Sequence, residues 1–260
     1  VWNRSIARAG ALRAAGAAVA PDPAAAVRAA PLVVVCLLDT PAVDAVLDAA
    51  GPLTGRTVVN LTSSTPEDAR AVAERVTARG ARYVDGTVMV PTPLVGTPDG
   101  FVLYSGDPAA FAEHRATLTA FGGELEHLGE DPGRAAVLDL GMLDVFFTGM
   151  TAFLHAAAVV GADGVPATAF LPYARRMLGL LDGTFAGLAR DVDAGEHPGD
   201  EDTLEMELTF LDHIVATSRA RGVDPSVAGT ARALAATAVA AGYGKDGWSR
   251  LVDVLRGTVR

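Results

Sequence analysis

The sequence predicts an α/β domain built on a largely parallel, doubly wound sheet, followed by one long helix and an all-α domain. Up to residue 131, short apolar segments alternate with helical segments of about ten to fifteen residues, which is typical of such a sheet. Residues 133–160 contain no proline and are interpreted as one helix of roughly 40 Å, long enough to link two domains. We therefore expect a sheet domain at 1–131, an interdomain helix at 132–162 and a helical domain at 163–260. Helical patterns in the last of these cover 167–189, 202–221, 225–241 and 248–256.

The predicted sheet domain consists of short strands and capped helices. Residues 32–38 and 57–61 are largely apolar and rich in branched side chains, as in strands that are buried on both faces. Thr40 with Pro41, and Thr65 with Pro66, are typical of an N-cap and the first turn of the helices that follow these strands. The other expected elements are strands at 1–2, 17–19, 83–88, 101–104 and 124–128 and helices at 5–15, 22–29 and 108–120.

The long helix carries one carboxyl group on an otherwise apolar face. At about 100° per residue, the side chains that share the face of Asp139 are Leu143, Phe146, Phe147 and Met150. Asp144 falls on another flank, and we expect the helix itself to be buried. Desolvation disfavours the charged form of a carboxyl group, so Asp139 is a candidate proton donor or cation partner. The alternative is a structural carboxyl group that a neighbouring side chain satisfies.

Composition narrows the classes of function. The formal net charge of −10 argues against nucleic-acid binding, because proteins of that class usually carry a basic patch. The five histidines show no spacing typical of metal ligands, and we predict no metal site. Cys36 is the only cysteine, and we expect a packed thiol without a disulfide partner. We find no signal peptide and no continuous apolar run of the roughly 20 residues that a membrane span needs, so we expect a cytoplasmic protein without a membrane segment.

The start of the sequence bears on a possible nucleotide ligand. A dinucleotide-binding sheet normally begins with a strand, a G-x-G-x-x-G turn and a helix, and the residue that contacts the ribose follows about 20 residues later. This sequence has no such strand–turn–helix unit, so we expect a domain that is incomplete at its N-terminus. Asn3, Arg4 and Ser5 would then occupy the ribose-reading position, where a guanidinium group suits a 2′-phosphate and favours NADPH. The alternative is a surface arginine beside a helix cap.

Ligands of parallel sheets bind at the carboxyl ends of the strands. Ser63 follows one predicted strand, and its hydroxyl group is suited either to a substrate or nicotinamide ribose, or to turn formation with Thr65. Leu37 and Leu38 end another strand, and they form either a wall for the nicotinamide or part of the strand core. Two further sets are candidates for a substrate pocket, with packing as the alternative: the loop residues Met89 and Pro91, and the helical residues Tyr173, Met177, Met206 and Phe210.

Several segments, in this order, carry a resemblance to a known family. They are VWNRS at 1–5, VCLLD at 35–39, NLTSSTP at 60–66, DGTVMVP at 85–91, VGTP at 95–98, LYSG at 103–106 and LDL at 138–140. Together they resemble the NADPH-dependent imine reductases, within the wider 6-phosphogluconate and β-hydroxyacid dehydrogenase superfamily. The resemblance covers nearly the whole chain.

This resemblance implies a Rossmann domain, a long interdomain helix and a helical domain that interlocks with a second subunit. It implies active sites between the Rossmann domain of one subunit and the helices of its partner. Hydride would pass from NADPH to the carbon of a C=N bond, with Asp139 at the position of the family's catalytic Asp or Tyr. Leu143, Phe146 and Phe147 would line the substrate pocket beside it.

Two departures from the family pattern concern the substrate. In the reductive-aminase branch, the position of Ser63 is usually Asn and the position of Phe147 is usually Tyr, and phenylalanine cannot donate a hydrogen bond. The resemblance therefore favours reduction of preformed imines over coupling of a ketone with an amine. A rival β-hydroxyacid dehydrogenase or semialdehyde reductase would need a lysine on the long helix, and the only lysine is Lys245. A catalytically inert dimeric NADP-binding protein is the other alternative.

Overall fold

The computed structural model describes residues 1–259, which form two compact units. The first unit comprises Val1–Asp144, and the second begins at Val145. The division falls inside a single helix, α6 (Arg134–Ala162), which corresponds to the helix predicted at 133–160. Each unit is described by itself below.

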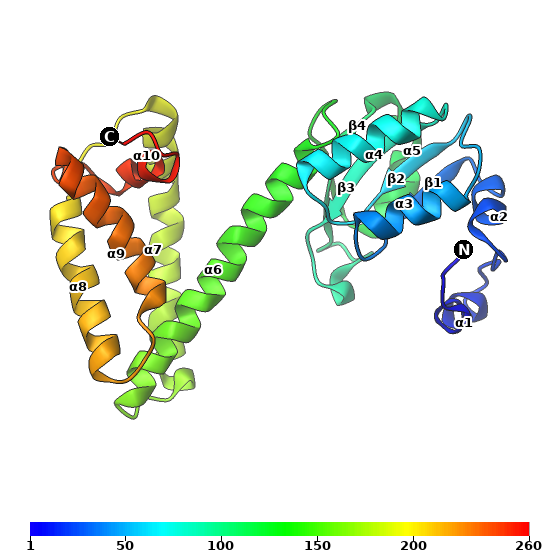
Figure 1. Ribbon diagram of the computed structural model, residues 1–260. Helices are drawn as coiled ribbons and strands as arrows, with labels where there is room; N and C mark the ends of the chain where they lie inside the picture. Colours follow the sequence, from blue (N-terminus) through cyan, green and yellow to red (C-terminus); the bar gives the residue numbers. More distant parts are fainter. Residues whose placement is uncertain (260) are drawn as a thin grey trace. The chain divides into compact units, whose positions relative to one another are not determined.

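The first unit is built on a five-stranded sheet with the strand order β1-β2-β3-β4-β5 (Figure 1). All neighbouring strands are parallel except β3 and β4, which are antiparallel. The predicted Rossmann-like, largely parallel sheet is therefore confirmed. The strands are β1 (Leu32–Val35), β2 (Thr57–Asn60), β3 (Arg82–Val88), β4 (Phe101–Gly106) and β5 (Glu124–His127).

Apolar clusters cover both faces of this sheet. Val58 packs with side chains of α2, α3 and α4, whereas its neighbour Val59 packs with side chains of α5. Successive residues of a strand point to opposite faces, so the helices lie in two layers around the sheet. The helices are α1 (Ile6–Ala14), α2 (Pro23–Arg28), α3 (Thr40–Ala49), α4 (Pro66–Ala78) and α5 (Pro108–Leu118), with short 3₁₀ turns η1 (Thr92–Leu94) and η2 (Thr119–Phe121).

Some local predictions were wrong. Residues 1–2 and 17–19 form no strand, although Val1 and Ala20 share a backbone hydrogen bond of 2.8 Å, because a pair of such short segments has no sheet to extend. The N-cap of α3 is Asp39 rather than Thr40, since the Asp39 carboxylate accepts a hydrogen bond from the Ala42 amide at 2.9 Å. The predicted Thr65 cap is confirmed, with its hydroxyl oxygen 3.1 Å from the Asp68 amide. Cys36 is exposed rather than packed, because β1 ends at Val35.

Helix α6 is largely exposed in the single chain, which contradicts the expectation of a buried helix. Its buried residues are Ala135, Ala136 and Asp139, all in its first two turns. Farther along, Phe146 exposes 59% of its surface. By length and composition alone, α6 could also cross a membrane, a criterion that core helices of soluble proteins meet as well. The exposure has a simple physical reason: the apolar face predicted from the sequence has no cover within one chain.

The second unit is entirely helical, as predicted. After α6 it contains α7 (Ala167–Ala194), α8 (Leu204–Ala220), α9 (Ser226–Ala238), the π-helical turn η3 (Val239–Tyr243), η4 (Trp248–Arg250) and α10 (Leu251–Leu255). Leu204, Ala235, Ala238 and Leu251 form its buried apolar cluster. The glycine-rich turn at 242–247 joins helices. A side chain on Gly247 would place its Cβ atom 2.2 Å from the Pro198 carbonyl oxygen, so close packing explains that glycine.

Candidate active site

The site begins with the anchoring of α6 to the sheet. Ser105, on β4, is fully buried, and its hydroxyl group donates to the Pro132 carbonyl at 2.9 Å. The same oxygen accepts a hydrogen bond from the Ala135 amide at 3.0 Å, which satisfies one of the unpaired N–H groups at the start of α6. This double contact fixes the first turn of α6 against β4.

A second anchor lies just before the helix. The Asp131 carboxylate accepts two hydrogen bonds from the Arg70 guanidinium, at 2.9 and 2.8 Å, and Arg70 belongs to α4. The Arg70 hydrogen bonds, with one from the Gly133 amide, lower the pKa of Asp131 to about 2. A Cβ atom on Gly133 would come within 2.8 Å of the Arg70 guanidinium carbon, so glycine permits this approach. The start of α6 is therefore held by both α4 and β4.

Asp139 lies one helical turn beyond Ala135 and is only 3% exposed. Its Oδ2 atom is buried and has no hydrogen-bond partner among the described residues. Burial raises the pKa of Asp139 above its ordinary value of 3.8, and the nearby hydroxyl groups of Thr87 and Ser63 partly oppose that shift. An unpartnered buried carboxyl oxygen costs stability, which is typical of groups retained for binding or catalysis.

A polar row on β3 continues from this carboxyl group. Tyr83, Asp85 and Thr87 share one face of the strand, because side chains alternate with a period of two. The Tyr83 hydroxyl donates to Asp85 Oδ1 at 2.7 Å, and the Asn60 amide of β2 donates to the Tyr83 oxygen at 3.2 Å. On the opposite face, a Cβ atom at Gly86 would lie 2.8 Å from the side chains of Leu61 and Tyr104, so that face is closely packed.

A surface cavity of about 580 Å³ lies at the N-terminal ends of α3 and α4. It is lined by Asp39, Thr40, Pro41, Asp44, Ser63, Ser64, Thr65, Asp68 and Leu140. Ser63 belongs to its wall, and Ser63 also lowers the pKa of Asp139. The cavity therefore adjoins the carboxyl ends of β1 and β2, where the sequence predicted ligand contacts.

The first unit brings several predicted site residues together. The Asp139 carboxyl group is near the hydroxyl groups of Ser63 and Thr87, and the Thr87 hydroxyl group lies 3.6 Å from the Met89 sulfur atom. Leu38 is 89% exposed at the end of β1, whereas Leu37 packs against the buried cluster that includes Val35.

The other predicted pocket residues lie on α6, in a loop of the first unit and on helices of the second unit. Leu143 is half-buried, and Pro91 lies in an exposed loop. Phe146 and Phe147 are exposed on α6, with their ring centroids 5.8 Å apart. Four further predicted residues are exposed on helices of the second unit, and they are Tyr173, Met177, Met206 and Phe210.

The N-terminal segment offers groups suited to a nucleotide. The Asn3 side chain accepts a hydrogen bond from the Ser5 amide at 2.9 Å and so orders the turn before α1. Arg4 is exposed, and no ion pair in the described part of the chain includes it. Arg4 and Leu38 are thus both accessible to a ligand. Within residues 1–259, no G-x-G-x-x-G turn joins a strand to a helix, and no three metal-ligating side chains form a cluster.

Sequence reasoning missed Asn60, Tyr83, Asp85 and Thr87 as members of this site. Their signal was present in the pattern of β3, where hydroxyl and carboxyl groups occupy every second position of a buried strand. A buried strand normally alternates or continues with apolar residues, so three polar groups on one face indicate a polar network.

Comparisons with known proteins agree with this architecture. Residues 1–129 match the family model for the NAD binding domain of 6-phosphogluconate dehydrogenase, and residues 131–257 match that for the NADPH-dependent reductive aminase-like C-terminal domain. An NADPH-dependent reductive aminase of Aspergillus oryzae is 32% identical over 98% of this chain and 88% of its own length.

Solved structures extend this similarity. A reductive aminase of Aspergillus terreus has a TM-score of 0.92 at 38% identity, over 98% of this chain and 90% of its own. A Streptomyces aurantiacus imine reductase has a TM-score of 0.94 at 36% identity, over 98% and 89%. The fold and these matches define an NADPH-dependent oxidoreductase of the Rossmann type. More closely, the chain belongs to the family of NADPH-dependent reductive aminases and imine reductases, as the resemblance implied.

Proposed function

We propose that this protein reduces the C=N bond of cyclic imines or iminium ions to amines, with Asp139 as the group that serves the substrate nitrogen. The observation that carries the proposal is the buried Asp139 carboxyl group, one oxygen of which accepts no hydrogen bond from the part of the chain that the structure describes. Such a group either donates a proton to the nitrogen or holds an iminium cation. A carbonyl or β-hydroxyacid reductase would need a lysine on α6, and the chain's only lysine, Lys245, pairs with Glu205 in the second unit.

NADPH, when bound, supplies the hydride that reduces the imine carbon. We assign Asn3, Arg4 and Ser5 to the 2′-phosphate end of the cofactor, and Leu37, Leu38 and Ser63 to the nicotinamide end. Ser63 also adjoins Asp139, so its hydroxyl group can orient both the cofactor ribose and the carboxyl group. These assignments rest on the free Arg4 guanidinium and on the exposed position of Leu38 at the carboxyl end of β1.

The substrate pocket is proposed to combine two sets of apolar side chains. Met89, Pro91 and Leu143 come from the first unit, and Phe146 and Phe147 lie farther along α6. The second set is Tyr173, Met177, Met206 and Phe210, which a partner subunit would contribute. Because Phe147 offers no hydrogen-bond donor and Ser63 is shorter than asparagine, we expect preformed imines to be better substrates than a ketone and an amine together.

We also propose an obligate homodimer in which the helical halves interlock. The exposed apolar side chains of α6 and α7 support this, since Leu154, Tyr173 and Leu180 each expose about two thirds of their surface and α6 passes the composition test for a membrane span. When a partner subunit covers this apolar surface, the assembled protein is soluble. We place it in the cytoplasm, without a membrane segment and without nucleic-acid or metal partners.

The test is to measure NADPH oxidation by the purified protein in the presence of a cyclic imine. The readout is the decrease in cofactor absorbance. We expect turnover with formation of the amine, and slower turnover with NADH. A matched reaction with a ketone and an amine measures reductive amination, and Phe147→Tyr should narrow the difference between the two reactions. Tight NADPH binding without turnover of any imine would instead identify an inert cofactor-binding protein.

A further inference from the structure

A series of buried hydrogen bonds runs from β3, across the end of β2, to the loop after β1. The Tyr83 hydroxyl group donates to Asp85 Oδ1 at 2.7 Å, and the Asn60 amide group donates to the Tyr83 oxygen at 3.2 Å. Asn60 Oδ1 accepts from the Thr62 backbone amide at 3.2 Å, and Thr62 Oγ1 accepts from the Leu37 backbone amide at 3.0 Å. Thr62, Asn60, Tyr83 and Asp85 are each 2% exposed, and we call these four residues the cross-strand network.

Asp85 sets the direction of these hydrogen bonds. An ionised carboxyl group can only accept, so the Tyr83 hydroxyl group donates to it and leaves its own oxygen free to accept from Asn60. The Asn60 side chain then directs its nitrogen to Tyr83 and its oxygen to the Thr62 amide. A side-chain bond to the amide two residues on is typical of asparagine in turns. A residue of β3 thereby fixes the course of the chain after β2.

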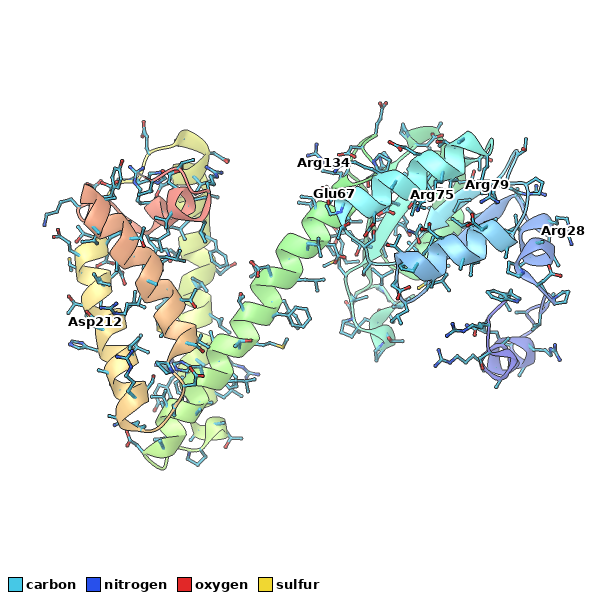
Figure 2. All side chains as sticks on the ribbon, viewed as in Figure 1. Arg28, Glu67, Arg75, Arg79, Arg134 and Asp212 are labelled. Carbon is cyan, nitrogen blue, oxygen red and sulfur yellow. The ribbon has the colours of Figure 1, made fainter. Side chains whose placement is uncertain are left out.

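The helices on one face of the sheet cover the cross-strand network. The Tyr83 ring packs in the apolar cluster that includes side chains of α2, α3 and α4. Arg75 of α4 forms an ion pair with Asp44 of α3 on the outer side of this layer (Figure 2). In such a buried site, hydrogen bonds are stronger than in water and an unmade one is costly. The network therefore favours a single arrangement of the two loops that it joins.

These two loops flank the predicted ligand site. The backbone hydrogen bonds between β1 and β2 end with one of 2.7 Å to the Val35 carbonyl. Beyond it, the bond between Thr62 and Leu37 joins the two loops. The next residue of one loop is Leu38, which is 89% exposed, and the next residue of the other is Ser63, which lines the surface cavity. The network thus ends one residue away from both accessible groups.

We propose that the cross-strand network positions the nicotinamide end of the cofactor by holding these two loops at a fixed separation. This inference rests on the proposed function, which assigns both loops to that end of NADPH. The network acts through the loops, so its members are positioning residues. A displacement of about 1 Å can lower a reaction rate by about 10²-fold, whereas NADPH affinity also depends on the contact proposed for Arg4. Loss of the network should therefore lower the rate of hydride transfer far more than the affinity for NADPH.

The first experiment measures the link between the loops without turnover. Amide hydrogen exchange of the full chain without NADPH, followed by NMR, should show a protected Leu37 amide. Exchange should be about tenfold faster in Thr62→Val, which removes the acceptor at nearly constant volume, and Thr62→Ser should restore the protection. If the Leu37 amide of the wild type exchanges as fast as that of an unstructured peptide, or if Thr62→Val leaves its exchange unchanged, the proposal is overturned.

Tyr83→Phe tests the whole network rather than one bond. It removes a hydroxyl group that does not contact Leu37, yet exchange of the Leu37 amide should be about threefold faster. The matched control is Thr57→Val, the same change in another buried threonine, whose hydroxyl oxygen accepts from Arg82 at 3.0 Å. It should leave the Leu37 amide unchanged. Equal effects of Tyr83→Phe and Thr57→Val, or no effect of Tyr83→Phe, would contradict coupling through the network.

The second experiment follows single turnovers of a cyclic imine. The rate constant reports hydride transfer, whereas the amplitude reports the fraction of active protein, which is all that a loss of stability would lower. In Thr62→Val and Tyr83→Phe, the rate constant should fall by about tenfold or more, with the dissociation constant of NADPH within about threefold of the wild type. Thr57→Val should keep the wild-type rate constant. Variants that lower only the amplitude, or that weaken NADPH binding as much as they lower the rate constant, would refute a positioning role.

Addition of NADPH distinguishes a failure of this inference from a failure of the proposed function. NADPH should slow exchange of the Leu37 amide in the wild type, and it should do so less in Thr62→Val. If this difference is present but the wild type reduces no imine, the role of the network towards the cofactor stands and the proposed function fails. If imines are reduced but NADPH leaves exchange of the Leu37 amide unchanged, the proposed function stands and this inference fails.

Discussion

Replacement of Asp139 by asparagine separates the chemical role of this residue from a structural one. The change keeps the volume of the side chain but removes both the charge and the transferable proton, so turnover of a cyclic imine should fall by about 10²-fold, the scale of a positioned acid. Stability should not fall with it. Asp139 Oδ2 makes no hydrogen bond that the amide could break, and burial already disfavours its charge.

The pH dependence gives the sign of the stability effect. Because the folded-state pKa of Asp139 is raised above 3.8, its stabilising protonated form is fully present at lower pH, and that stability is lost as pH rises through the folded-state pKa. Asp139→Asn has no such loss. The free energy of unfolding of Asp139→Asn, measured relative to that of the wild type, should therefore be at least as high at pH 7 as at pH 3.5. Urea unfolding at both pH values measures this difference.

The matched control is Asp144→Asn, which lies about 140° farther round the same helix by the 3.6-residue period. It should retain most of the activity, with NADPH affinity unchanged in both variants. An Asp139→Asn enzyme that reduces imine at the wild-type rate would show that water supplies the proton. A variant that loses activity and stability in parallel would show that Asp139 supports the fold rather than the reaction.

Four further predictions follow from the same geometry. Arg4→Ala should weaken NADPH binding by about tenfold to a hundredfold, or roughly 1.5–3 kcal/mol, because it removes a charge-assisted contact; an unchanged Michaelis constant for NADPH would exclude that contact. Ser105→Ala should lower the free energy of unfolding by about 1–3 kcal/mol, since it leaves the buried Ala135 amide and the Pro132 carbonyl without their hydrogen bonds, and should lower kcat as α6 shifts. Because the pKa of Asp131 is lowered to about 2, the stability that it contributes should be present above pH 4 and lost towards pH 2, and Asp131→Asn should remove this loss in acid unfolding. Light scattering should give the mass of a dimer, and an active monomer would refute the interlocked arrangement.

The sequence predicted the sheet because its local signals agree with one another. Branched runs such as 32–35 and 57–60, each followed by a capped helix, leave few alternatives to a parallel sheet. The position of Asp139 was also predictable, because helical phase alone places it among apolar side chains. The sequence pattern was less reliable at the ends of helices. The N-cap of α3 is Asp39 rather than Thr40, because the Asp39 carboxylate accepts the hydrogen bond from the helix, and both residue types are common N-caps.

The polar network around Asp139 could not be predicted in the same way. Asn60 and Asp85 are twenty-five residues apart, and only the register of β2 with β3 places them side by side. Ser105 contacts α6 from β4, and β4 pairs with β3 in antiparallel orientation. The alternation of strands and helices in the sequence does not reveal that orientation. The expected burial of α6 was wrong for another reason: helical periodicity identifies an apolar face, but it does not say whether any part of the protein covers that face.

The structure divides α6 into two parts with different physical demands. Its first two turns are fixed by Ser105 and by the Arg70–Asp131 pair, and they hold Asp139 at a buried position that is costly for a charge. From Val145 onward, the side chains are mostly exposed and apolar, which, apart from the proposed pocket residues Phe146 and Phe147, suits assembly rather than chemistry. Substitutions in the first part should therefore change kcat and its pH dependence, whereas substitutions at exposed apolar positions outside the proposed pocket, such as Leu154, should change activity only through protein concentration, as the proposed dimer dissociates. Dilution series of the two kinds of variant distinguish these effects, because only the second kind should lose specific activity on dilution.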